Sequence, residues 1–226
     1  MQSGSLPFAD VKSDAWYADA VQYAYEKGLM NGVSASAFAP DGTATRGQIV
    51  TILYRLAGSP AVSGGSFADV NSGAWYADAV AWASANGIVT GYENGSFGPD
   101  DEITREQLAV ILYRYVKRQG QGFTGLWYFP LNFSDAAAVS SWADEAMHWC
   151  VMKGILSGTD KSTLEPGATA TRAQIAAILQ RFCELPQEND QSEAERAFDG
   201  AAAYLTTVVS APRYGSIGGE WTVAAL

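Results

Sequence analysis

Apolar residues recur with helical spacing in six segments of the chain, and these segments form three similar pairs. In the first segment of each pair the apolar positions fall at i, i+4, i+5 and i+8: Trp16, Ala20, Val21 and Ala24; Trp75, Ala79, Val80 and Ala83; and Trp142, Ala146, Met147 and Cys150. In the second they fall at i, i+3, i+4 and i+7: Ile49, Ile52, Leu53 and Leu56; Leu108, Ile111, Leu112 and Tyr115; and Ile175, Ile178, Leu179 and Phe182. The pattern predicts three pairs of amphipathic helices.

Start and stop signals bound these predicted helices. Each second helix is preceded by Thr-Arg-x-Gln, at Thr45–Gln48, Thr104–Gln107 and Thr171–Gln174. A Thr three residues before a Gln is a capping box, in which the two side chains bond each other's backbone amides. Each first helix is followed by a glycine suited to the left-handed position after a helix: Gly28, Gly87 and Gly154.

The pairs are copies of one unit. Each opens with Phe-x-Asp, and the distance from its Trp to its motif Arg is 30 residues in every copy (16 to 46, 75 to 105 and 142 to 172). The loop between the helices carries a glycine, an apolar residue and a proline at matching places. One helix-loop-helix cannot bury its own apolar stripe. The sequence therefore predicts a compact all-α bundle in which three repeats share a core with approximate threefold symmetry.

We place the repeats at residues 8–58, 67–117 and 133–184, and the connectors between them differ. A Gly/Ser/Pro linker follows the first repeat, whereas the second connector carries four aromatic residues: Phe123, Trp127, Tyr128 and Phe129. We interpret these aromatics as packing onto the bundle, with a sugar-stacking platform as the alternative. The third repeat has one extra residue between Asp135 and Trp142, which is expected to distort that loop.

Residues 185–226 change in character. An acidic linker leads to a predicted helix from Glu193 to about Val209, and the last residues, 214–226, are apolar and glycine-rich. This end is similar to the opening repeat of α/α-toroid modules of the terpenoid-cyclase or prenyltransferase-like kind, so we expect a truncated or partly ordered tail.

Composition and charge narrow the class of partner. The chain has 226 residues, 48% of them hydrophobic, which suits a soluble globular protein with a real core. Its net charge of -10 argues against nucleic acid and anionic membranes. No stretch predicts membrane insertion, and the first residues lack the pattern of a signal peptide. Cys150 and Cys183 replace apolar residues of the other repeats, which favours buried thiols over a disulfide or metal site.

Catalytic patterns are missing from the sequence. The single histidine, His148, has Gln22 and Ala81 as its counterparts, so we interpret it as a solvated helix position. There is no metal-spaced His/Cys cluster, phosphate loop or nucleophile elbow, and the loop acids do not follow a calcium-binding pattern. We therefore expect no enzyme activity, no catalytic residues, no metal and no cofactor.

The motif arginines are candidates for anion binding. Arg46, Arg105 and Arg172 each occupy the first helical position, where the helix dipole slightly disfavours a cation. A helix N-terminus with free amides beside a guanidinium fork would suit a carboxylate or phosphate. The alternative is that each Arg packs on a neighbour and pairs with a nearby acid. Three further arginines recur near the C-termini of the same helices, where the dipole favours a cation and no function is needed: Arg55, Arg114 and Arg181.

The combined motif of Phe-x-Asp, Trp, a closing Gly, then Gly, Phe, Pro and Thr-Arg-x-Gln resembles the S-layer homology domain over residues 8–184. The resemblance implies three prongs around a central bundle in a monomeric pseudo-trimer. It also implies non-covalent attachment to the bacterial cell wall, on the outside of the cell. The implied ligand is a secondary cell-wall polysaccharide ending in pyruvylated N-acetylmannosamine, bound in grooves between the prongs. The family motif ends in Glu, whereas all three copies here end in Gln.

The pyruvate carboxylate makes Arg46, Arg105 and Arg172 the expected anion anchors. Nine further residues are candidates, each with a structural alternative. The glycines let backbone approach a sugar or serve a turn: Gly32, Gly91 and Gly158. The acids bond sugar hydroxyls or staple loops: Asp10, Asp69 and Asp135. The tryptophans stack on a sugar or, as their place in the stripe suggests, belong to the core: Trp16, Trp75 and Trp142. The second functional hypothesis is a helical scaffold that holds a partner peptide, and the third is an anchoring fragment of a larger protein.

Overall fold

The structure is a computed structural model, and it describes residues 6–62, 67–123, 125, 127–159 and 162–186. The chain divides after Leu185 into two compact units. The second unit begins at Pro186, so the predicted helix from Glu193 and the toroid-like end lie outside the described residues. All that follows concerns the first unit.

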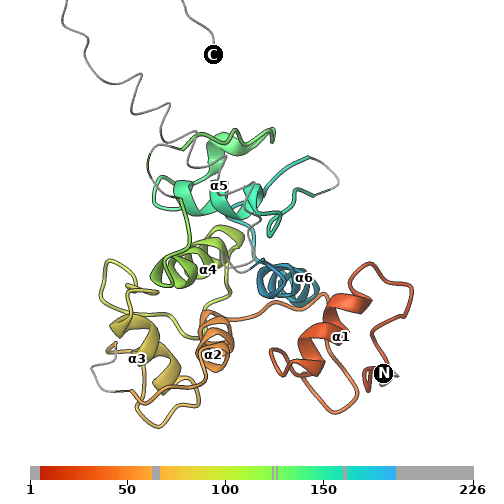
Figure 1. Cartoon of the computed structure of the whole chain (residues 1–226). Coiled ribbons are helices and arrows are strands. Elements are labelled where there is room, and N and C mark those ends of the chain that lie inside the picture. The colour runs from red at the N-terminus through yellow and green to blue at the C-terminus, as the bar shows by residue number, and fades with distance from the viewer. Residues whose placement is uncertain (1–5, 63–66, 124, 126, 160–161, 187–226) are drawn as a thin grey trace, which may run out of the picture. The chain divides into compact units, whose positions relative to one another are not determined.

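The described residues are helical, which confirms the predicted all-α class. Six α-helices and one 3-10 turn occur in them: α1 Ala18–Glu26, α2 Arg46–Leu56, α3 Ala77–Ala85, α4 Arg105–Arg118, η1 Ala136–Ala138, α5 Asp144–Met152 and α6 Arg172–Cys183. Figure 1 shows α2, α4 and α6 gathered at the centre, with α1, α3 and α5 outside them. The second helix of each repeat therefore builds the bundle and the first helix builds a prong.

Each prong packs on the central helix of another repeat. The contacts join α2 to α3, α4 to α5, and α6 to α1 (Figure 1). The last pair brings the first helix of the chain against the last described one. One continuous hydrophobic core runs through all three repeats and includes the apolar loop residues Phe38, Phe97 and Leu164. The three units are thus interlocked, because each central helix is covered by a neighbour's prong.

The predicted helix boundaries hold where side chains define them. Thr45, Thr104 and Thr171 all form complete capping boxes with their Gln partners. The closing glycines also adopt the predicted left-handed conformation, with φ of 66°, 66° and 69° at Gly28, Gly87 and Gly154. The first helices, however, begin later than the apolar stripe suggested, at Ala18, Ala77 and Asp144. Each repeat's Trp therefore lies in the loop before its helix.

A ring of backbone hydrogen bonds joins the loops that precede the central helices. Antiparallel bridges pair Thr45 with Glu102, Thr104 with Thr169, and Thr171 with Thr43. The third bridge connects repeat three back to repeat one. The same loops give the central helices their cyclic order, so the ring closes without any covalent link between its ends.

The predictions for the connector between repeats two and three and for the loop and helix that follow it are partly confirmed. The extra residue of repeat three lies in a loop that forms the short turn η1. In the second connector, Phe123 stacks on Trp127 at 4.1 Å between ring centroids and packs on the core, as predicted. Tyr128 is 89% exposed, so the packing interpretation is wrong for that residue. His148 is not solvated as expected, because it lies half-buried beside Trp127 and Asp144.

Cys150 is a buried free thiol, as the sequence indicated, and Cys183 is free and half-buried. Burial raises the pKa of the Cys150 thiol strongly, so it stays protonated. Among the described residues, no helix is both long and apolar enough to cross a membrane.

The capping boxes lead to a stability prediction. Thr104→Ala removes the hydroxyl that accepts from the Gln107 amide, and we expect a loss of about 1 kcal/mol in the free energy of unfolding. Thr104→Ser keeps the hydroxyl and is the matched control. Urea unfolding followed by circular dichroism measures both. An equal loss in the two variants would show that packing of the Thr methyl, and not the cap, carries the effect.

Candidate functional site

Three clefts of similar construction lie around the central bundle, and each is lined by residues of all three repeats. Their volumes are about 420 Å³ beside α6, about 400 Å³ beside α4 and about 230 Å³ beside α2. We name them the α6, α4 and α2 clefts. In each, one repeat supplies the loop after its first helix and the outer side of its central helix. The preceding repeat in the cycle supplies its motif Arg, and the following one supplies its Trp.

The sequence-predicted residues meet in these clefts across repeats. The α4 cleft brings together Arg46 of repeat one, Gly91 of repeat two and Trp142 of repeat three. The α6 cleft combines Arg105, Gly158 and Trp16, and the α2 cleft combines Arg172, Gly32 and Trp75. The capping Gln residues also line them. Because no cleft is complete within one repeat, the closed ring is a requirement of the site.

Each motif Arg is held by backbone carbonyls of the next repeat. Arg46 Nε donates to Phe97 O at 2.9 Å, Arg105 Nε to Leu164 O at 2.7 Å, and Arg172 Nε to Phe38 O at 2.8 Å. Two of them use a second nitrogen: Arg105 Nη2 donates to Ser157 O and Arg172 Nη2 to Asn31 O. These bonds fix each guanidinium at the floor of its cleft.

No carboxylate pairs with these cations. Among the described residues, no acid oxygen lies within ion-pair distance of Arg46, Arg105 or Arg172. Burial lowers the pKa of each. More distant groups partly offset that effect on the pKa: Tyr92, Asp101 and Asp69 for Arg46, Glu165 and Asp135 for Arg105, and Asp10 for Arg172. A guanidinium remains protonated under such shifts. The alternative in which each Arg pairs with a nearby acid is therefore wrong. The clefts keep a net positive charge, although Glu93 lines the α4 cleft.

The helix N-termini themselves offer no anion site, contrary to expectation. The amides of Arg46 and Gly47 donate to Asp101 O and Pro99 O, each at 2.9 Å. The equivalent amides of α4 and α6 bond the corresponding carbonyls of the next loop, and the capping Thr takes the third amide. The first-turn amides bond carbonyls of the neighbouring repeat and are not free for a ligand. The positive charge in each cleft therefore comes from side chains.

Sequence reasoning missed a second cation in every cleft. Arg55, Arg114 and Arg181 line the α2, α4 and α6 clefts respectively. Their position near helix C-termini accounts for them electrostatically, which hid their recurrence as a signal. Each lies nine residues after a motif Arg, on the central helix of the repeat that owns the cleft. Every cleft thus contains two guanidinium groups from two repeats.

The three motif tryptophans are surface residues, so their assignment to the core is wrong. Trp16, Trp75 and Trp142 are 68%, 62% and 55% exposed. Because they precede the helices, they project from the prongs instead of joining the apolar stripe. Trp16 and Trp75 meet the Tyr that follows each of them edge-on, at 5.3 and 5.1 Å. An exposed indole at the wall of a cleft offers a flat apolar face to a ligand.

The three acids act within the loops. Both oxygens of Asp69 accept backbone amides, from Phe97 at 2.8 Å and Gly98 at 2.7 Å. Asp10 and Asp135 make the same pair of bonds in their repeats. Desolvation opposes the effect, but these amides and the neighbouring Arg charge hold the pKa of each carboxyl below its usual value. The carboxylates thereby position the carbonyls that bind the arginines.

The cleft glycines, Gly32, Gly91 and Gly158, have no room for a side chain. A Cβ at Gly91 would lie 2.5 Å from the Phe67 ring, and Gly91 has φ of +71°. Gly32 and Gly158 face Phe8 and Phe133 in the same way. A Cβ at Gly91 would also lie 2.6 Å from Ser96 O, and loop carbonyls approach Gly32 and Gly158 as well. Close approach of the motif Phe and of a loop carbonyl thus accounts for all three glycines, while their backbone lines the clefts.

The sequence comparisons agree with this architecture. The family model of the S-layer homology domain matches residues 7–50, 66–109 and 132–176, one match for each repeat. The chain belongs to the S-layer homology domain family. The predicted resemblance is confirmed, and the SLH repeats are binding modules through which surface proteins are anchored.

Several curated proteins are similar to this SLH chain. It is 30% identical over 182 residues to an endoglucanase of Bacillus sp. (strain KSM-635), covering 79% of this chain and 19% of that protein. It is 30% identical over 176 residues to the surface-layer 125 kDa protein of Lysinibacillus sphaericus, covering 76% and 14%. A cellulosome-anchoring protein of Acetivibrio thermocellus is 26% identical over 161 residues, covering 69% and 35%. The chain thus spans about a third or less of the length of these relatives.

The loop acids of the SLH repeats predict an acid-sensitive stability. Because the folded pKa is lowered at Asp10, Asp69 and Asp135, their contribution is complete above the unfolded pKa and is lost as pH falls through the folded pKa. The triple Asp→Asn variant should therefore lose less stability than the parent between about pH 6 and about pH 3. Urea unfolding at both pH values measures the difference. Equal losses would mean that other groups dominate acid unfolding.

Gly91 provides a second test. Gly91→Ala meets the Phe67 ring as well as the positive-φ penalty, whereas Gly95→Ala has φ of +79° and open space around its Cβ. We expect Gly91→Ala to lower the free energy of unfolding by about 1 to 3 kcal/mol more than Gly95→Ala. Chemical denaturation of the two variants gives the comparison. Similar losses would show that neither the Phe67 ring nor Ser96 O confines the glycine.

Proposed function

We propose that this SLH chain holds its protein on the cell wall by binding an anionic, pyruvylated secondary cell-wall polysaccharide in the three clefts. The observation that carries the proposal is a buried guanidinium without an acid partner at the floor of each cleft, beside an exposed Trp. A carboxylated sugar matches both features, since it has an anionic end and an apolar ring face.

The cleft chemistry favours a compact anion over a long acidic segment. A carboxylate at the floor can take the Nη donors that the loop carbonyls leave unused, and a charge-assisted bond of this kind is worth about 1.5 to 3 kcal/mol. The second Arg, on the central helix, lies on the same cleft and adds to the positive potential. The net charge of -10 would repel polyanions at long range. Recognition is therefore local to the clefts.

The Trp supplies the second contact in this proposal. The C–H face of a pyranose ring stacked on an indole removes apolar surface of both partners from water. The glycine residue lines the cleft, whereas the loop acid does not line it and holds the loop in place. In this assignment Asp10, Asp69 and Asp135 support the site, whereas the Arg, Trp and Gly residues line it.

Three clefts on one rigid body suit a repetitive polymer. Once one polysaccharide end is bound in a cleft, other polysaccharide ends of the same cell wall lie at high local concentration near the remaining clefts. Three weak sites therefore combine into firm attachment. The interlocked core keeps the clefts at constant spacing. This arrangement supports an anchor more than a catalyst, and we extend it to the chain as a non-enzymatic module of a longer surface protein.

A helical scaffold for a partner peptide is the second candidate. The α4 cleft favours it more than the others, because it has the larger apolar lining, from Ile88, Val89, Val110 and Ile111. A peptide carboxylate would use the same Arg. The two functions differ in the partner that must be removed to abolish binding, which an experiment with cell walls can decide.

The exposed tryptophans make the sharpest test, since the buried arginines also hold the fold. We expect the triple variant Trp16→Ala, Trp75→Ala and Trp142→Ala to bind purified sacculi about tenfold more weakly or worse, with unchanged unfolding, because each lost indole weakens one of three cooperating clefts. Tyr128→Ala, an exposed aromatic outside the clefts, is the matched control. Co-sedimentation with sacculi measures binding.

The same assay with treated walls separates the candidates. Removal of the pyruvate groups should abolish binding by the parent chain if the carboxylated sugar is the ligand. Binding that survives removal of the whole polysaccharide would contradict the proposal and favour a protein or peptidoglycan partner. Equal sedimentation of the triple Trp variant and the Tyr128 control would remove the tryptophans from the site.

A further inference from the structure

We propose that the three clefts are unequal and that the α4 cleft is the principal binding site of the chain. The inference rests on the proposed function. It adds a ranking of the three clefts and names the residues that cause the difference between them. Two independent features distinguish this cleft: its Arg keeps more unused donors, and the loop and helix on either side of its Trp are tied to α4 by contacts that the other two prongs lack.

The guanidinium of Arg46 is less used by the protein than its counterparts. Arg105 and Arg172 each donate Nη2 to a loop carbonyl, but Arg46 makes no such bond to Thr90, the equivalent residue. The terminal nitrogens of Arg46 are not buried atoms that lack a partner, because Trp149 Nε1 is the one such side-chain atom in the described part of the chain. Both terminal nitrogens of Arg46 are therefore reached by solvent, and they form the two-pronged donor that a carboxylate takes best.

An aromatic ring holds Arg46 in place of the missing bond. The Arg46 Cζ lies 4.6 Å from the centroid of the Tyr92 ring and 4.8 Å from that of Phe97. Arg172 shares the second of these contacts, with Phe38 at 4.6 Å, so Tyr92 is the ring that distinguishes Arg46. Tyr92 lines the α4 cleft, whereas the equivalent residues of the other loops are Val33 and Thr159. Ring contacts orient the guanidinium plane without consuming its N–H groups. The α4 cleft is therefore lined by two aromatic residues, Tyr92 and Trp142.

The loop that carries Trp142 is tied to α4 just before the indole. Glu106 is buried at the start of α4, where its two oxygens accept from Ser140 N and Ser140 Oγ, each at 3.0 Å. The equivalent positions in the other central helices are Gly47 and Ala173, which have no such acceptor. This contact therefore exists for one prong only.

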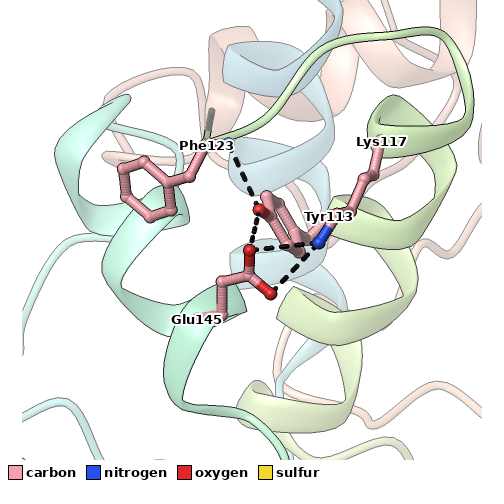
Figure 2. A network of polar contacts seen from close by, with 4 residues as sticks. All are labelled: Tyr113, Lys117, Phe123 and Glu145. Atoms are coloured by element: carbon pink, nitrogen blue, oxygen red, sulfur yellow. Dashed lines mark hydrogen bonds and ion pairs between the residues drawn. The ribbon is translucent and has the colours of Figure 1, made fainter. Parts of the chain in front are cut away.

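A second tie follows three residues after Trp142. Tyr113 Oη donates to Glu145 Oε1 at 2.7 Å and accepts the Phe123 amide at 3.2 Å, while Lys117 Nζ bonds both Glu145 oxygens (Figure 2). Figure 2 shows Tyr113 and Lys117 reaching from α4 to Glu145 on α5, with the connector at Phe123 bound to the same hydroxyl. The equivalents of Lys117 are Gly58 and Glu184, which cannot make this ion pair.

Trp142 therefore stands between two clamps, at Ser140 and at Glu145, that bind its loop and helix to the wall of its own cleft. It is also the least exposed of the three tryptophans. A residue already held in its bound position loses less freedom when the ligand arrives, and the saving appears as affinity. Trp16 and Trp75 have neither clamp. Among the residues that the structure describes, each has only the edge-on contact with the Tyr that follows it, which lies on its own prong and does not tie the prong to a central helix.

Each cleft has its own Trp, so one titration can rank all three. The chain has seven tryptophans. The protein is labelled with 5-fluorotryptophan, and the resonances of Trp16, Trp75 and Trp142, the three cleft resonances, are assigned with single Trp→Phe variants. The probe is the methyl glycoside of pyruvate-ketalated N-acetylmannosamine, followed by ¹⁹F NMR. We expect the Trp142 resonance to shift at a probe concentration about fivefold or more below those that move Trp16 and Trp75.

Two hydroxyl deletions test the clamp. Tyr113→Phe should raise the probe concentration needed to shift Trp142 about threefold or more and leave Trp16 and Trp75 unchanged, since the clamp acts on one prong. Tyr54→Phe is the matched control, because its hydroxyl bonds Pro60 O and no residue of a prong. Loss of structure would instead alter all three resonances together.

The outcomes of the titration distinguish failure of the cleft ranking from failure of the proposed carbohydrate-binding function. If the three cleft resonances shift together, or if Trp16 or Trp75 shifts at a lower probe concentration than Trp142, the ranking is overturned and the carbohydrate function stands. The ranking also fails if Tyr113→Phe and Tyr54→Phe behave alike at Trp142. An intact protein in which no Trp resonance shifts overturns the proposed ligand and the ranking with it.

Discussion

The structure depends on one repeated recognition between neighbours. The first turn of each central helix donates to alternate carbonyls of the next repeat's loop: in the first interface, Arg46 Nε, Gly47 N and Arg46 N bond the carbonyls of Phe97, Pro99 and Asp101. Those carbonyls are presented correctly because Asp69 holds the same loop through two amides. Since the same set of bonds joins repeat three to repeat one, the fold is a closed ring and cannot be built from fewer repeats without leaving buried donors unpaired.

This constraint explains why the site and the fold share residues. An Arg at the first helical position is unfavourable for its own helix, but there its Nε reaches a neighbour's carbonyl while its terminal nitrogens reach the cleft. A lysine could not do both, since it has one nitrogen and no rigid fork. Alteration of Arg46 would therefore disturb assembly and binding together, and surface groups such as Trp142 and Arg114 report on binding more cleanly.

Much of this architecture could be predicted from the sequence, and the failures have physical causes. The capping boxes and closing glycines are local signals, and they placed the helix ends correctly at residues such as Thr104 and Gly87. Trp142 misled because its position fits the apolar stripe, although the chain is not yet helical there. Local reasoning also left the N-terminal amides of α2 free, because the carbonyls that bind them, such as Pro99 O, lie about fifty residues away in the chain. The clefts were beyond sequence reasoning for the same reason. Each combines residues from three repeats in a cyclic order that one repeat's motif does not reveal, and Arg114 drew no attention because its helix position already explained a cation.

Departures from the repeat are more informative than the repeat itself. Glu106 replaces the Gly or Ala of the other copies, and it is buried where a carboxylate is costly unless its oxygens are bonded. Ser140 supplies both bonds. Lys117 and Tyr92 are likewise peculiar to the second repeat, and all three act on the same cleft. These three departures from the repeat lie around one Arg and one Trp, and they, not the shared motif, are what distinguishes the proposed principal cleft from the other two.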